Sequence, residues 1–210
     1  MNMKNRFVRF FFVISAVLVL LSITAADAGE KYKHDGFYLR LTTGAGGIVS
    51  REKAERTEVS FSGPGGMTSL GIGLALRENL MVNADLFGSV VRNPEMKIDG
   101  EKIGKSSVEL QSTGLGVGLT YYIMPVNLYL SGSVGIASQS AKVNQFKYET
   151  KEGYGLNFLF GKEWWVGGSW GLGVAAQFFF NSVPDKNLLT GKEYRFKTTG
   201  IGILFSATYN

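Results

Sequence analysis

Few residues in this sequence have side chains that could do chemistry at a catalytic or metal site. Among the 210 residues there is no cysteine and one histidine, His34. This excludes disulfides, thiolate nucleophiles and metal sites built from several histidines. Glu95, Asp99 and Glu101 have the oxygen ligands that calcium prefers, but lysines are interleaved with them, which favours a solvated loop of mixed charge. We therefore expect no catalytic residue, metal ligand or cofactor, no enzyme activity, and a solvated His34.

Two other residues, Arg40 and Asp85, are set apart by their surroundings. Each is the sole charged residue of a long segment, 36–49 and 79–91 respectively, and each lies on the polar face of an alternating pattern. A charge removed from water needs polar partners. We expect the two residues to belong to a polar network, acting either as a fixed plug or as a gate whose ion pair can break. The amides that could join this network are those of Asn83, Gln111, Asn157 and Gln177.

The segments that carry these residues alternate with period two, which is typical of β-strands. In 200–209, large apolar residues such as Ile201, Ile203 and Phe205 occupy every second position. Glycine on alternate positions is poor for a helix, so no helix is expected after residue 28. The pattern predicts eight strands, at about 36–49, 67–77, 79–91, 108–123, 127–138, 153–163, 168–181 and 194–209.

The distribution of charge indicates what these strands face. Stretches such as 67–76, 113–122 and 199–209 contain no Asp, Glu, Lys or Arg, whereas a soluble sheet has charges on its solvent face. The large apolar side chains are therefore expected to face lipid. In lipid every backbone group must be paired, so the sheet has to close on itself. The predicted fold is all-β, an eight-stranded antiparallel up-and-down transmembrane β-barrel.

The start of the chain and the links between strands predict an orientation. A basic N-terminus, an apolar run at 10–21 and an Ala-x-Ala pattern at 26–28 are typical of a secretory signal peptide. We assign 1–28 to a cleavable signal peptide and 29–210 to the barrel. The links between the predicted strands are alternately long and short, as expected for external loops and periplasmic turns. Both termini are therefore expected in the periplasm.

Aromatic residues at the predicted periplasmic strand ends are typical of an interfacial girdle. They are Phe37, Tyr121, Phe160, Trp164, Trp165, Trp170 and Tyr209. The mature chain resembles the small eight-stranded outer-membrane barrels of Gram-negative bacteria: the OmpA transmembrane domain, the OmpX/Ail group and the OmpW group. Gly202, Phe205 and Tyr209 are similar to the C-terminal assembly signal of these proteins. That resemblance implies recognition by the barrel insertion machinery.

Two interpretations of the glycine-rich inner faces stay open: a tightly packed interior, or a cavity for an acyl chain or small solute. The external loops have a small excess of basic residues, which suits contact with outer-membrane lipid and lipopolysaccharide phosphates. No basic cluster is dense enough to predict nucleic-acid binding. We expect a non-enzymatic integral outer-membrane protein with a structural or surface-interaction role, binding any host or cell-surface ligand through its external loops. The alternative is a narrow channel or carrier for small apolar solutes.

Overall fold

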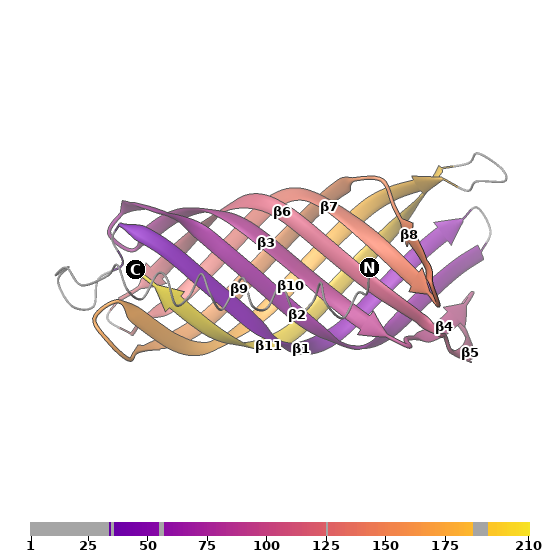
Figure 1. The fold of residues 1–210 in the computed structure, drawn as a ribbon, viewed down its shortest axis with the longest axis horizontal. Helices are drawn as coiled ribbons and strands as arrows, with labels where there is room; N and C mark the ends of the chain where they lie inside the picture. Colours follow the sequence, from indigo (N-terminus) through magenta and orange to yellow (C-terminus); the bar gives the residue numbers. More distant parts are fainter. Residues whose placement is uncertain (1–33, 35, 55–56, 125, 187–192) are drawn as a thin grey trace. The chain divides into compact units, whose positions relative to one another are not determined.

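Eight strands close into an antiparallel barrel, which confirms the predicted fold. The computed structural model describes residues 34, 36–54, 57–124, 126–186 and 193–210, and the predicted signal peptide lies outside them. The ring runs β1-β2-β3-β6-β7-β9-β10-β11 and closes by pairing β11 with β1 (Figure 1). Its strands are β1 (Phe37–Ala54), β2 (Thr57–Arg77), β3 (Leu80–Arg92), β6 (Val108–Ile123), β7 (Leu128–Val143), β9 (Gly153–Trp165), β10 (Trp170–Lys186) and β11 (Glu193–Tyr209).

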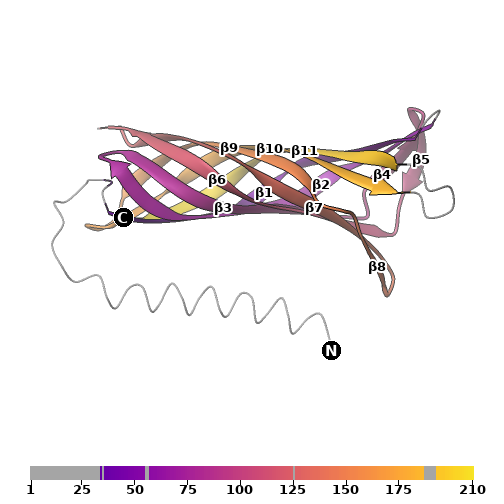
Figure 2. The same cartoon turned by 90° about the horizontal axis from the view of Figure 1, so that it is seen from above.

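Several strands extend further at one end than the sequence pattern predicts. β1 and β2 pair as far as Ala54 and Thr57, so most of the long link predicted at 50–66 is strand. Three shorter strands lie at the same end: β4 (Glu95–Ile98), which pairs with β2, β5 (Glu101–Lys105), which pairs with β4, and β8 (Phe146–Glu149), which pairs with β7. Figure 2 shows them at the end opposite the C-terminus. The long loops are therefore largely paired hairpins.

The short turns lie at the end of the barrel that holds the C-terminus. Asn79, between β2 and β3, has φ 69°, and Asn127, before β7, has φ 53°. Asparagine tolerates this left-handed conformation better than most residues. The short links predicted near these positions are thus tight turns.

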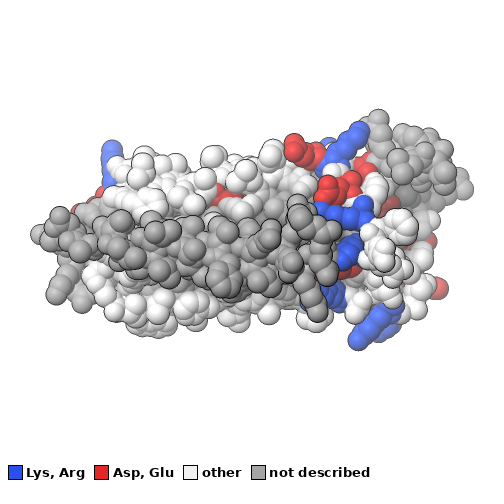
Figure 3. Space-filling model, in the orientation of Figure 1, with Lys and Arg blue, Asp and Glu red and all other residues white. Residues whose placement is uncertain are grey.

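The outer face of the barrel is apolar across its middle. Large hydrophobic residues are exposed on strands around the ring, among them Leu74 on β2, Val117 on β6, Val134 on β7 and Ile203 on β11. On the face seen in Figure 3, charged side chains gather at the end that contains β4, β5 and β8. The described part of the chain contains no helix long and apolar enough to span a membrane.

The inner face is filled, and aromatic rings do much of the filling. Phe87 of β3 is opposite Gly114 of β6, and Phe179 of β10 is opposite Gly200 of β11. In each pair, a Cβ added to the glycine would run into the ring of its partner. Both rings are fully buried, in a cluster with Ile48, Met67, Val91 and Leu204. Tyr129 covers Gly161 in the same way. Of the two interpretations of the glycines, the structure supports the packed interior.

Candidate functional site

Asp85 is the centre of a polar network in the middle of the lumen. Its side chain is buried and accepts hydrogen bonds from Ser69 Oγ at 2.6 Å, Ser133 Oγ at 2.6 Å and Asn157 Nδ2 at 2.9 Å. These donors come from β2, β7 and β9, and Gln177 of β10 extends the network by donating to Asn157 Oδ1 at 2.7 Å. Hydrogen bonds to an ionised group are the strong ones. The carboxylate therefore ties three other strands to β3 across the lumen, and Asn157 connects β10 to them.

Arg40 belongs to a second, neighbouring group. Its guanidinium donates to Ser131 Oγ at 2.9 Å and to Thr120 Oγ1 at 3.5 Å, and it lies 4.9 Å from the centre of the Tyr129 ring. Thr120 in turn donates to Asn83 Oδ1 at 3.2 Å. Within the described residues Arg40 and Asp85 form no direct ion pair; hydroxyls and amides lie between them. A gate that works by breaking that ion pair has no counterpart in this arrangement.

Glu163 is a third buried charge, and the sequence analysis missed it. The carboxylate is fully buried near the end of β9, where it accepts from Ser206 Oγ and Thr208 Oγ1, both at 2.7 Å, and from the Tyr122 hydroxyl at 3.3 Å. The signal was present, because Glu163 has the same parity as Asn157 on a strand whose odd positions face inward. Because two tryptophans directly follow Glu163, the sequence pattern indicates an aromatic girdle at this strand end and gives no prominence to the carboxylate.

His34 and Trp165 both depart from their predicted positions. His34 is fully buried rather than solvated, stacked on the Tyr122 ring at 3.5 Å between centroids, and its Nε2 lies 2.7 Å from Asn127 Oδ1. Trp165 packs against His34 at the mouth of the lumen, with 4.8 Å between the ring centroids, instead of pointing outward. These side chains cover the end of the barrel that has the short turns.

The other predicted girdle residues lie on the outward face at that end. Phe37, Tyr121, Phe160 and Trp164 are exposed. Trp170 and Tyr209 contact each other edge to face at 5.2 Å, and Phe37 lies 6.4 Å from Tyr209. Of the assembly-signal residues, Phe205 also faces outward, whereas Gly202 faces inward and packs against β1 and Met67.

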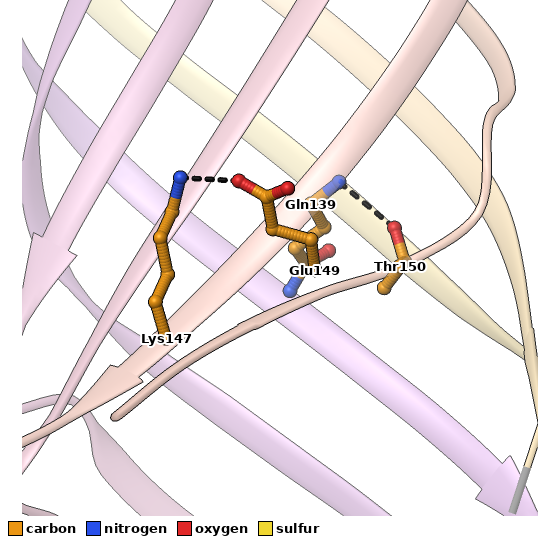
Figure 4. A network of polar contacts seen from close by, with 4 residues as sticks. All are labelled: Gln139, Lys147, Glu149 and Thr150. Carbon is orange, nitrogen blue, oxygen red and sulfur yellow. Dashed lines mark hydrogen bonds and ion pairs between the residues drawn. The ribbon is translucent and has the colours of Figure 1, made fainter.

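The opposite end of the lumen closes with uncharged polar groups. Gln139 donates from Nε2 to Ser50 Oγ at 2.9 Å and accepts at Oε1 from Thr198 Oγ1 at 2.6 Å. A cavity of about 10 Å³ remains beside them, room for about one water. Gln111, a candidate for the network, points outward and is exposed. Figure 4 shows Thr150 accepting from the Gln139 backbone at 3.0 Å, close to the ion pair between Lys147 and Glu149.

Beyond this closure, the outer hairpins contact one another. Tyr148 on β8 donates a hydrogen bond to Asp185 on β10, and Tyr194 on β11 donates to the same carboxylate at 3.2 Å. Burial, followed by the hydrogen bond with Asp185, raises the pKa of the Tyr148 hydroxyl above its ordinary value. Tyr148 therefore stays a donor at neutral pH and links two hairpins that are not paired as strands.

The fold resembles solved outer-membrane proteins. No protein-family profile and no curated protein matches the sequence. Among solved structures, neisserial surface protein A has a TM-score of 0.54 and 13% identity over 83% of this chain and 96% of that chain. OprG from Pseudomonas aeruginosa has a TM-score of 0.48 and 12% identity over 86% and 100%, and Ail of Yersinia pestis has 0.43 and 10% over 82% and 99%. The chain has the fold of the small outer-membrane β-barrel proteins.

Proposed function

We propose that the protein is an integral outer-membrane protein with a non-enzymatic, structural or surface-interaction role, and that its paired outer hairpins are the functional surface. The exposed apolar belt supports insertion of the barrel in a membrane, because a soluble monomer rarely exposes a continuous apolar surface around its middle. The orientation proposed puts the short turns and both termini in the periplasm. Gly202, Phe205 and Tyr209 are then the residues proposed to signal to the insertion machinery.

The filled lumen is the single observation that carries the functional part of this proposal. Three buried charges, each hydrogen-bonded, and the aromatic rings over the glycines fill the described part of the lumen, and the cavity beside Gln139 has a volume of only about 10 Å³. A conducting path needs continuous space, and breaking these networks leaves buried charges without partners. A rigid plug leaves the hairpins beyond the belt as the place where a partner can bind.

Two features support a surface role over catalysis or transport. The sole histidine is buried at the end away from the long hairpins, and the described residues contain no group of three His, Cys, Asp or Glu side chains suited to a metal. At the hairpin end, Phe146 is 82% exposed at the start of β8, next to Val143 at 43%. Such an apolar tip suits a partner contact. The alternative function, a narrow channel or carrier for small apolar solutes, has less support, because the apolar groups inside the barrel already pack against one another.

The test is conductance of the protein after its insertion has been verified. The refolded protein is reconstituted into vesicles, protease protection establishes that the barrel is inserted, and the same preparation is fused with a planar bilayer. We expect protected protein and no discrete conductance. Reproducible steps would overturn the closed lumen and support the channel, and loss of protection would overturn the membrane position itself.

A further inference from the structure

Several charged residues on the outer hairpins form ion pairs with residues of opposite charge. Arg92 Nε contacts Glu109 Oε2 at 2.7 Å across β3 and β6. Glu95 accepts from Lys102 at 2.5 Å and lies 3.8 Å from Lys97. Cross-strand pairs of opposite charge stabilise a sheet, and like charges directly opposite each other destabilise it. Like charges do face each other in two of the hairpins, Lys97 with Lys102 and Lys142 with Lys147. In each case an acid is at hand, because Glu95 contacts both lysines of the first pair and Glu149 contacts Lys147 of the second.

The junction of β1 and β11 differs, because two like-charge pairs follow each other there and neither has an ion-paired acid in the described residues. Arg51 is directly opposite Lys197, and Lys53 is directly opposite Arg195. All four residues are exposed and share the outward face, and no ion pair joins them to an acid within the described ranges. We call them the cation seam. Glu58, on β2, is in register with Lys53 but forms no ion pair with it there.

The Arg51–Lys197 pair has serines in register on both sides, whereas the Lys53–Arg195 pair has Glu58 on one side and Pro184 on the other. Ser60 of β2 is in register with Arg51, and Ser182 of β10 is in register with Lys197. One row across four strands thus reads hydroxyl, guanidinium, ammonium, hydroxyl. Arg195 donates to Ser182 Oγ at 3.3 Å. Ser182 itself is buried, so the groups open to a ligand in this row are the two cations and Ser60. Guanidinium and ammonium groups are donors of the kind that bind phosphate oxygens.

The position of the cation seam selects the source of that phosphate. From Lys197 toward the other end of β11, the next outward-facing residues are Thr199, Ile201, Ile203 and Phe205. The side chains of the last three are 66%, 75% and 51% exposed and belong to the apolar belt. The cations therefore stand at the edge of the apolar belt. A lipid whose acyl chains lie against the isoleucines would present its headgroup at this level.

We propose that the cation seam binds the phosphate groups of an outer-leaflet glycolipid. Residues opposite each other across two strands are about 5 Å apart at Cα, and residues i and i+2 about 7 Å. Each cross-strand pair can thus hold one phosphate, and the two pairs together suit a lipid with two. Bound phosphate offsets the repulsion of the like charges. This inference rests on the membrane position proposed above and names the partner of one surface there.

The test is the thermal stability of the refolded protein in neutral detergent, with and without purified lipopolysaccharide. At about 100 times Kd the lipid should raise the Tm by roughly 5–10 °C. Compared with the unsubstituted protein, Lys197→Glu should have a higher Tm without lipid and a lower Tm with lipid. Without lipid it converts a like-charge pair into an opposite-charge pair and should raise the Tm by about 2 °C; with lipid, most of the increment should vanish. A substitution that merely disturbs the structure would lower both values.

Arg92→Glu is the matched control, because Arg92 is an exposed rim cation that already has an acid partner. It should lower the Tm without lipid and leave the lipid increment intact. An unchanged increment in Lys197→Glu would overturn the proposal. An equal effect of inorganic phosphate, or of lipopolysaccharide stripped of its phosphates, would overturn the lipid phosphate as the ligand. Protease protection in vesicles is measured on the same variants. Loss of the lipid effect in protein that is still protected would refute lipid binding by the cation seam, whereas loss of protection would refute membrane insertion.

Discussion

Gly114→Ala should destabilise the barrel, although alanine is a better strand residue than glycine in open space. The added Cβ would meet the ring of Phe87, which lies on the opposite strand. Phe87 is 1% exposed and packed among Ile48, Met67 and Phe179, so it cannot swing away freely. Overpacking of this kind costs about 1–3 kcal/mol of unfolding free energy.

Gly47→Ala is the matched control and should have the opposite sign. Gly47 lies on the outward face of β1, with no atom within 4 Å of an added Cβ. Alanine at such a position stabilises by about 0.4–1 kcal/mol, because it restricts the unfolded chain. The two variants should thus differ by about 1.4–4 kcal/mol, or roughly 3–16 °C in Tm for a chain of this length.

The assay is urea unfolding in lipid vesicles, followed by tryptophan fluorescence. Phe87→Leu in the Gly114→Ala background should recover part of the loss, because the smaller side chain makes room for the methyl group, and a double-mutant cycle would measure that coupling. Equal shifts for Gly114→Ala and Gly47→Ala would refute the reasoning. The rings would then not lie on the glycines, and the lumen would hold unfilled space.

Two further predictions concern the buried charges. Arg40→Ala should lower the unfolding free energy by about 2–4 kcal/mol, because it removes the donor to Ser131 and leaves a hole beside Tyr129; insertion into vesicles should persist, and an unchanged melting temperature would remove Arg40 from the network. Asp85→Asn keeps the volume but takes the charge from three hydrogen bonds and should cost about 1.5–3 kcal/mol. Planar-bilayer recordings of Asp85→Asn should stay silent, and discrete steps would show that the carboxylate alone keeps the lumen closed.

The eight strands could be predicted from the sequence because period-two alternation coincides with an absence of charge. A segment such as 199–209 has large apolar residues on one face and small or polar residues on the other, and the barrel keeps that division. The strand ends could not be predicted in the same way. Beyond the belt the outward positions of β1 hold Arg51 and Lys53, so hydropathy no longer alternates although the pairing with β2 continues.

The face of each lumen charge was predictable, but its partners were not. Parity along a strand places Arg40 and Asp85 inside. Their partners depend on the register between strands and on strand tilt, and a slip of one residue would reverse every face. His34 shows the same limit more strongly. It precedes the first strand and has no pattern around it. It is buried by Tyr122 and Trp165, which lie at the ends of β6 and β9, and by Asn127 in the turn before β7.

The glycines explain why a sequence rich in small inner residues could not distinguish a cavity from a plug. A glycine leaves space only if nothing from a neighbouring strand enters it, and that depends on register. Gly114 and Gly200 each lie opposite a phenylalanine, so their missing side chains are replaced by rings. Gly116 lies opposite Gly135, where the two backbones approach too closely for any Cβ. Neither kind of glycine provides a path for solute. This packing supports the proposal that the interior contributes stability and that recognition takes place at the outer hairpins and the cation seam.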